Sequence, residues 1–138
     1  MKKSLSRRKF IRDAAMASAG FFIVPRHVLG RGYVAPSDKL NIAGIGVGGK
    51  GTSDLWEFAK SPNVNIVALC DVDDRQAKQS RKNFPNAPYY KDFRVMLEKE
   101  KGTIDAVSVS TPDHTHFVAT MAAMQMGKHV YVQKPLTH

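Results

Sequence analysis

The sequence predicts an α/β fold in which helices cover both faces of one parallel sheet. From residue 39 onward, short apolar runs alternate with segments whose apolar residues recur at helical spacing, and the first run leads straight into a glycine-rich turn. Strand–helix–strand units of this kind connect in a right-handed sense and build a doubly wound sheet. We therefore expect one such domain over 39–138, preceded by a signal and linker over 1–32.

The first unit of this alternation covers residues 40–70. The apolar run 40–45 is expected to form the first strand, and the spacing of apolar residues over 52–60 predicts a helix. Residues 64–70 are almost continuously apolar, which is typical of a parallel strand buried on both faces. Cys70, the only cysteine in the chain, ends that strand. It is expected to behave as a small buried hydrophobe rather than as a reactive thiol.

The alternation continues to the end of the chain. A polar helix is expected over 75–84, with Asp73 or Asp74 at its N-cap, and Tyr89 and Tyr90 are expected to form a short strand. The remaining expected elements are a helix that Asp92 caps and that runs through Glu100, a strand over 104–109, a helix over 117–126 that Gly127 closes, and a strand over 129–132.

The glycine-rich turn carries the first functional signal. Gly44, Gly46 and Gly49 follow a strand and precede a helix at G-x-G-x-x-G spacing, which is the arrangement that a dinucleotide pyrophosphate requires. Gly44 is expected to permit the tight turn, Gly46 to leave room for the phosphates, and Gly49 to let the helix pack closely on its strand. With Gly48, these residues and the free N–H groups of the helix start form the predicted pyrophosphate site of a Rossmann-type domain.

A carboxylate at the end of the second apolar run indicates which dinucleotide binds. Asp71 follows Cys70, at the strand tip where a carboxylate accepts hydrogen bonds from the adenosine ribose diol. The predicted cofactor is therefore NAD. NADP is the alternative, with Arg75 or Lys78 reading its 2′-phosphate. The alternative for Asp71 itself is that it only caps the next helix.

The net charge of +9 is concentrated at the start of the chain. Residues 1–32 contain eight Lys and Arg against one Asp, whereas the remaining 13 basic and 11 acidic residues nearly balance. A near-neutral domain lacks the basic surface that nucleic-acid binding requires, so no nucleic-acid partner is expected.

The basic start has the layout of an export signal. Arg7 and Arg8 precede a weakly apolar stretch over 14–24 that is too short to span a bilayer, so no membrane span is expected in the mature domain. The paired arginines resemble a twin-arginine signal, which predicts a periplasmic or exported protein that uses the twin-arginine export machinery. The alternatives are an uncleaved leader that tethers the protein to the membrane, and a basic amphipathic helix or disordered tail.

Two further motifs lie at the ends of later strands. They are Thr-Pro-Asp-His-Thr-His over 111–116 and Gly-Lys-His-Val-Tyr-Val-Gln-Lys-Pro over 127–135. Together with the glycine turn they resemble the Gfo/Idh/MocA family of NAD(P)-dependent sugar and polyol oxidoreductases, over its nucleotide-binding half. The resemblance implies a Rossmann domain followed by a second α/β domain with most of the substrate pocket. No such domain follows His138, so the chain is expected to be a fragment, a truncated product or one half of a larger assembly.

The resemblance also implies roles for particular residues. Ser110, Thr111 and Pro112 would line the nicotinamide side of the cofactor, and His116 would border the same pocket. Lys134 would lie near the nicotinamide ribose and the reacting carbon, which makes it the predicted catalytic residue as well as a cofactor contact. A fixed cation there can stabilise the alkoxide that develops on a substrate oxygen.

Gln133, His114 and His116 lie within these motifs and have alternative interpretations. Gln133 stands where the family's Glu-Lys-Pro motif has Glu, so it keeps the shape of that side chain but not its charge. The alternative for His114 and His116 is helix capping and polar packing. A zinc site at these histidines is rejected because the sequence offers no Cys or carboxylate partner set, and no metal is expected.

These expectations combine into one function with two alternatives. The chain is expected to be the NAD(P)-binding half of an exported oxidoreductase that transfers hydride to or from a sugar-like or polyol-like small molecule. The resemblance also implies a NAD-dependent glycoside hydrolase as one alternative, and a non-catalytic nucleotide-binding module is the other. The chain alone is not expected to be active, and a homo-oligomer is left open.

Overall fold

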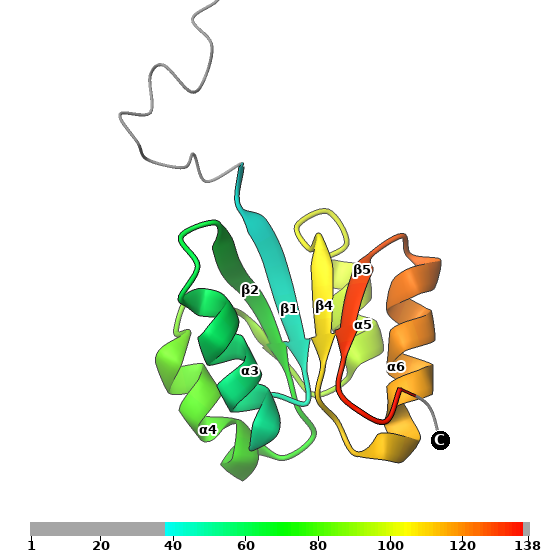
Figure 1. Cartoon of the computed structure of the whole chain (residues 1–138). Helices are drawn as coiled ribbons and strands as arrows, with labels where there is room; N and C mark the ends of the chain where they lie inside the picture. The colour runs from blue at the N-terminus through cyan, green and yellow to red at the C-terminus, as the bar shows by residue number, and fades with distance from the viewer. Residues whose placement is uncertain (1–37, 137–138) are drawn as a thin grey trace, which may run out of the picture. The chain divides into compact units, whose positions relative to one another are not determined.

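The computed structural model describes residues 38–136, so the expected signal and linker over 1–32 lie outside the described residues. The described part contains one five-stranded sheet with the strand order β3-β2-β1-β4-β5 (Figure 1). Its strands are β1 (Leu40–Ile45), β2 (Val64–Cys70), β3 (Tyr89–Tyr90), β4 (Ala106–Val109) and β5 (His129–Val132). Every neighbouring pair is parallel, so all carboxyl ends meet at one edge of the sheet.

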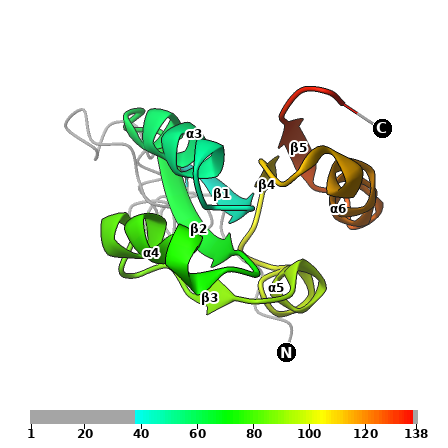
Figure 2. The same cartoon turned by 90° about the horizontal axis from the view of Figure 1, so that it is seen from below.

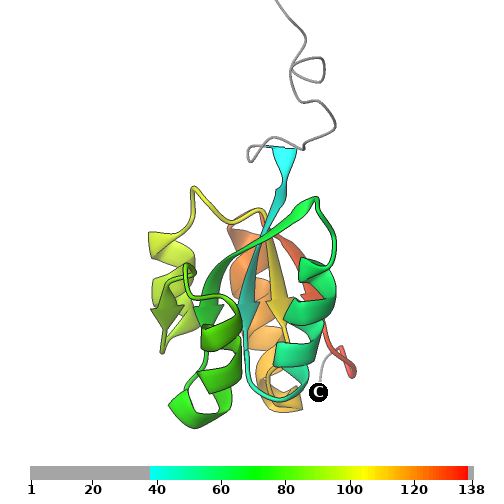
Figure 3. The ribbon, with the colours of Figure 1, turned by 90° about the vertical axis from the view of Figure 1, so that its left-hand side faces the viewer.

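Four helices connect these strands and cover both faces of the sheet. They are α3 (Lys50–Ala59), α4 (Asp74–Asn83), α5 (Phe93–Lys99) and α6 (Asp113–Gln125). Figure 2 shows α3 and α4 on one face and α5 and α6 on the other. In the view of Figure 3, the teal α3 and the yellow-green α5 lie on opposite sides of the sheet. The predicted doubly wound α/β fold is confirmed.

Each face of the sheet has its own apolar core. Under α5 and α6, Met96, Leu97 and Ala123 pack against the inward residues of β1, β2 and β4. Under α3 and α4, Leu55 and Ala77 pack against the other face of β1 and β2. Because both faces are covered, the central strands are apolar on both sides, which explains their near-continuous apolar runs.

The chain reverses its direction of travel across the sheet between β1 and β4. From β1 it proceeds through β2 to β3, and it then crosses to β4 and β5 on the other side of β1. The crevice outside the carboxyl ends of the strands at such a switch point is where ligands bind in open α/β sheets. Within residues 38–136, no helix is long and apolar enough to span a membrane.

The largest error in the expected elements concerns the start of α6. The helix begins at Asp113 and not at residue 117, because Pro112 adopts an extended conformation (φ −58°, ψ 147°) that opens the helix directly after it. The Thr115 hydroxyl donates to the Pro112 carbonyl at 2.8 Å, and the Asp113 carboxylate lies in the first turn, where the helix dipole favours a negative charge. His116 is therefore a helical residue.

The expected caps and the expected state of the cysteine are confirmed. The side chain of Asp73 accepts from Arg75 N and caps α4, and that of Asp92 accepts from Arg94 N and caps α5. Gly127 follows α6 with φ 72°, as a left-handed helix end requires. Cys70 is 3% exposed, and burial raises the pKa of its thiol to about 12, which leaves it inert.

Candidate cofactor-binding site

A cleft of about 440 Å³ lies at the switch point between β1 and β4. It is bounded by the glycine turn after β1, the end of β2 and the turn after β4. Its lining includes these members of the predicted site: Gly46, Gly48, Gly49, Asp71, Ser110, Thr111 and Pro112. The structure therefore brings together, at one edge of the sheet, the glycine turn, the carboxylate after β2 and the Thr-Pro turn after β4.

The first two motif glycines serve the fold differently from what the sequence suggested. Gly44 lies inside β1, and a Cβ there would meet the side chains of Leu55 and Val47 at 2.8 Å. Because glycine has no Cβ, α3 can pack on the strand at this point. Gly46 has φ +76°, and a Cβ there would lie 2.8 Å from the backbone of Ser110. A side chain at Gly46 would thus disturb the turn after β4 as well as the cofactor site.

The close approach expected of Gly49 is made by a different glycine. Gly49 is the N-cap of α3 with φ 47°, and a Cβ there would meet nothing within 4 Å, so its role is conformational. Gly51, in the first turn of α3, is buried, and a Cβ there would overlap the Gly46 carbonyl oxygen. Gly51 is therefore the residue that lets the helix start lie against the turn.

The carboxylate of Asp71 is bonded directly to the glycine turn. Its Oδ2 accepts from Gly48 N at 2.9 Å, and its Oδ1 accepts from Asp73 N at 2.9 Å. An ionised carboxylate has about four acceptor positions, so both oxygens retain capacity for further donors. Asp71 does not cap α4, because Asp73 does. The structure thus leaves Asp71 at the cleft with its Oδ2 bonded to the turn that would hold the phosphates.

His116 is placed behind the cleft and not at its border. The ring is 1% exposed and lies between two carbonyl oxygens, with Nδ1 2.7 Å from Pro135 O and Nε2 2.8 Å from Thr111 O. Both ring nitrogens thus face carbonyl oxygens, and His116 is not among the residues that line the cleft, so its role at the nicotinamide stays a prediction. Through these contacts His116 joins the turn after β4 to the loop after β5.

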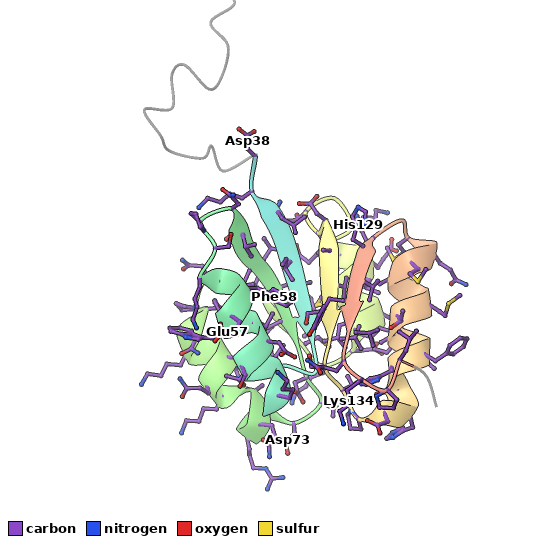
Figure 4. The ribbon with its side chains drawn as sticks, viewed as in Figure 1. Asp38, Glu57, Phe58, Asp73, His129 and Lys134 are labelled. Carbon is purple, nitrogen blue, oxygen red and sulfur yellow. The ribbon has the colours of Figure 1, made fainter. Side chains whose placement is uncertain are left out.

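Lys134 lies on the loop after β5, at the carboxyl end of the sheet, and is not among the residues that line the cleft. Figure 4 shows Lys134 at the same end of the sheet as Asp73, while Asp38 and His129 lie at the opposite end. Lys134 is exposed, and its side chain makes no hydrogen bond or ion pair with residues 38–136. Its ammonium is thus held only through the backbone of its loop and is available to a ligand.

A buried carboxylate that the sequence analysis did not single out lies beneath these turns. Asp54 on α3 is 6% exposed and accepts from Lys50 Nζ at 2.6 Å, Ser110 Oγ at 2.8 Å and Gln133 Nε2 at 2.7 Å. Burial acts to raise the pKa of Asp54, but these three hydrogen bonds and the charge of Lys50 outweigh it and lower that pKa below its usual value. Asp54 is therefore charged at neutral pH.

Helical spacing could have revealed both Gly51 and Asp54. With Leu55 and Phe58 they occupy positions i, i+3, i+4 and i+7 of α3, which is the face that a helix turns toward the core. A carboxylate on that face requires buried donors, and a glycine there requires a close neighbour. Within residues 38–136, no three His, Cys, Asp or Glu side chains are grouped as metal ligands would be.

Comparison with known proteins identifies the family. Residues 40–138 match the sequence profile of the oxidoreductase family GFO_IDH_MocA, described as an NAD-binding Rossmann fold. The chain belongs to the Gfo/Idh/MocA family. The resemblance drawn from the three motifs is confirmed, and the described domain is the NAD-binding Rossmann part of Gfo/Idh/MocA oxidoreductases.

Individual Gfo/Idh/MocA relatives agree on this part of the chain. "Glycosyl hydrolase family 109 protein 3" of Phocaeicola vulgatus is 32% identical over 117 residues, which cover 80% of this chain and 21% of that protein. The scyllo-inositol dehydrogenase of Lactobacillus casei, solved with NAD(H) and scyllo-inositol, is 25% identical to this chain with a TM-score of 0.65. The match covers 72% of this chain and 29% of the dehydrogenase chain. The myo-inositol 2-dehydrogenase of Lactobacillus plantarum is 29% identical with the same TM-score and coverage. The chain therefore spans less than a third of these three proteins.

Proposed function

We propose that this chain binds NAD at the cleft between β1 and β4, as the nucleotide-binding part of an oxidoreductase that acts on a sugar-like or polyol-like small molecule. The observation that carries the proposal is the bond from Gly48 N to the Asp71 carboxylate, at 2.9 Å. It fixes the Asp71 carboxylate beside the glycine turn that lines the same cleft, at the strand tips where this fold holds the ribose and the pyrophosphate. The inositol substrates named for the two dehydrogenases support the substrate class.

The residues of the cleft fit a dinucleotide along its length. Gly46, Gly48 and Gly49 would hold the pyrophosphate at the start of α3, and the Asp71 carboxylate would accept from the adenosine ribose diol. Thr111 and the residues on either side of it would line the nicotinamide side. When bound, NAD would supply the hydride acceptor, while the protein would orient the substrate and exclude water around it.

Lys134 would act on the substrate oxygen. Its ammonium, which has no partner among residues 38–136, lies on the loop after β5, at the edge of the sheet where ligands bind in this fold. A hydrogen bond from this ammonium strengthens as negative charge develops on the substrate oxygen, which happens when the hydroxyl proton is lost ahead of hydride transfer to NAD. We propose that a second domain in the full-length protein supplies the rest of the substrate pocket and the residue that takes up the proton.

Replacing Asp71 by Asn is expected to weaken NAD binding and to relax the preference for NAD over NADP. The amide keeps the size of the side chain but loses the charge that attracts a diol and repels a 2′-phosphate. A hydrogen bond to a charged group contributes about 1.5–3 kcal/mol, so the dissociation constant for NAD should rise on the order of 10- to 100-fold. Titration of both cofactors into the two proteins measures this.

Asp105→Asn is the matched control for that experiment. Asp105 precedes β4 at the amino end of the sheet, where its carboxylate accepts from Asn41 N, so the same charge change there should leave both cofactor affinities unchanged. If the parent chain binds NADP more tightly than NAD, Asp71 does not select the cofactor.

A glycosidase is the second candidate, and the names of several relatives favour it. Two relatives at 32% identity are named as glycosyl hydrolase family 109 proteins, one from Phocaeicola vulgatus and one from Solibacter usitatus. The two candidates differ in their net reaction. Net formation of reduced nicotinamide with a free sugar would support the oxidoreductase, and cleavage of a chromogenic glycoside without net consumption of NAD would support the glycosidase.

The basic start of the chain bears on where the protein is located in the cell. We propose that the chain is exported by the twin-arginine route, because Arg7 and Arg8 precede a weakly apolar stretch over 14–24. Changing both arginines to lysine keeps the charge and should leave the protein in the cytoplasm, whereas changing Lys2 and Lys3 to arginine should not. Fractionation of cells expressing each variant measures this, and continued export of the first variant would contradict the proposal.

A further inference from the structure

One oxygen atom of Asp54 connects the two turns on which the proposed chemistry depends. Asp54 Oδ2 lies 2.8 Å from Ser110 Oγ and 2.7 Å from Gln133 Nε2, and both groups donate to it. Ser110 opens the turn that continues into Thr111 at the cleft, and Gln133 directly precedes Lys134. These residues are far apart in the sequence, so the carboxylate is the point where their turns meet α3.

The backbone hydrogen bonds of Ser110 and Gln133 attach these two turns to the neighbouring strands of the sheet. Ser110 N donates to Ile45 O at 2.9 Å, and Gln133 N donates to Val109 O at 3.0 Å, which continues the parallel ladders by one residue each. The side-chain bonds to Asp54 add a second fixed point from the side of α3. His116 adds a third, through Thr111 O and Pro135 O. Lys134 lies between the Asp54 and His116 attachments of its loop.

The charge at Asp54 explains the amide at Gln133. A buried carboxylate is stable only where donors surround it, and Asp54 has Lys50, Ser110 and Gln133 as donors. A glutamate at 133 would bring a second carboxylate into contact with the first, and two like charges at hydrogen-bond distance cannot both stay ionised without a large cost. One member of the pair can carry the charge, and here that member is Asp54.

We propose that Asp54 is a positioning residue for the Lys134 loop, and that Asp54 and Gln133 form a matched pair in which the carboxylate lies on α3 and not on the residue before the lysine. Asp54 acts through Ser110 and Gln133, which fix the separation between the turn that lines the cleft and the loop that carries the ammonium. This assignment rests on the proposed function only for its kinetic consequence, because the pairing itself is a property of the folded chain.

The pairing can be tested in this chain by a double-mutant cycle. Gln133→Glu should lower the melting temperature by at least about 4–8 °C, since each kcal/mol lost has that effect in a domain of this size. Adding Asp54→Asn should recover most of that loss, because the double variant again has one carboxylate and one amide at the contact. Glu57→Gln is the control, since Glu57 on α3 makes only an exposed ion pair with Lys60, directly after that helix, and the substitution should change the melting temperature very little.

A positioning role of Asp54 should also change the surroundings of Thr111 and Lys134, which a loss of stability alone would not do. The backbone amide resonances of Thr111 and Lys134 should shift in Asp54→Asn and stay unchanged in Glu57→Gln. In the full-length protein, Asp54→Asn should lower kcat about 10- to 100-fold while KM for NAD changes less than about threefold, because misplacing a reacting group affects the chemical step.

Two results would overturn the proposal. The first is a Gln133→Glu loss of stability that Asp54→Asn leaves unrelieved or increases, including a double variant that does not fold. The second is an Asp54→Asn protein whose Thr111 and Lys134 resonances match those of the parent. Melting temperatures and amide resonances are both measured in this chain without any turnover. If the parent chain fails to bind NAD, that result contradicts the proposed function, but the test of the Asp54–Gln133 pair still applies.

Discussion

Replacing Gly51 by Ala should lower the melting temperature of this domain by roughly 10 °C or more. Alanine is about 1 kcal/mol better than glycine in an ordinary helix, so helical propensity alone predicts a gain in stability. The packing predicts the opposite, because the new Cβ would overlap the Gly46 carbonyl oxygen and approach Ser110 Cβ to 3.2 Å. The overlapped atom belongs to the backbone, so relief requires α3 to move away from the turn.

Gly102→Ala is the matched control for this substitution. Gly102 is exposed, a Cβ there would meet nothing within 4 Å, and its backbone lies outside the left-handed region, so alanine should be neutral or slightly stabilising. Thermal unfolding followed by circular dichroism compares the two variants. A Gly51→Ala protein as stable as the parent would show that the helix start does not lie against the glycine turn.

The second large effect concerns Lys134 and is expected on turnover. In the full-length protein, Lys134→Met should lower kcat on the order of 10²- to 10³-fold, which is the usual cost of removing one preorganised donor to a developing oxyanion. The dissociation constant for NAD should stay within a few-fold of the parent value, because the interaction forms mainly in the transition state. Steady-state kinetics combined with cofactor titration separate the two quantities.

Lys82→Met controls for the loss of a positive charge. Lys82 is exposed on α4, away from the loop after β5, so its replacement should leave kcat unchanged. Because Lys134 is exposed and has no partner among residues 38–136, its removal should also leave the melting temperature unchanged. A Lys134→Met protein with near-normal kcat would show that Lys134 is an ordinary loop lysine.

The elements of the fold were largely predictable because strands and turns carry local signals. The bounds of β1, β2 and β5 agree with the expected ranges, since each is an apolar run that polar, glycine or proline residues delimit. The predicted start of α6 was wrong because Asp-His-Thr-His over 113–116 is polar and has no helical spacing of apolar residues, whereas Pro112 and Asp113 already provide a helix start.

The site was predictable only as far as its motifs are local. Asp71 and the glycine turn could be matched by spacing, because each follows a strand that ends at the same edge of the sheet. The roles of Gly51 and Asp54 depend on contacts with Gly46, Ser110 and Gln133, which are distant in sequence or lie in another element. Helical spacing places both residues on the buried face of α3 but does not identify the partners that they meet there, and no single motif contains those partners.

Binding of NAD at the cleft can be measured directly by titrating NAD into this chain and following the backbone amide resonances. We expect saturable binding, with the shifted resonances concentrated at the following residues of the cleft: Gly46, Gly48, Gly49, Asp71 and Thr111. The absence of saturable binding at millimolar NAD, or shifts confined to the basic groove around Lys78 and Arg81 on α4, would contradict it.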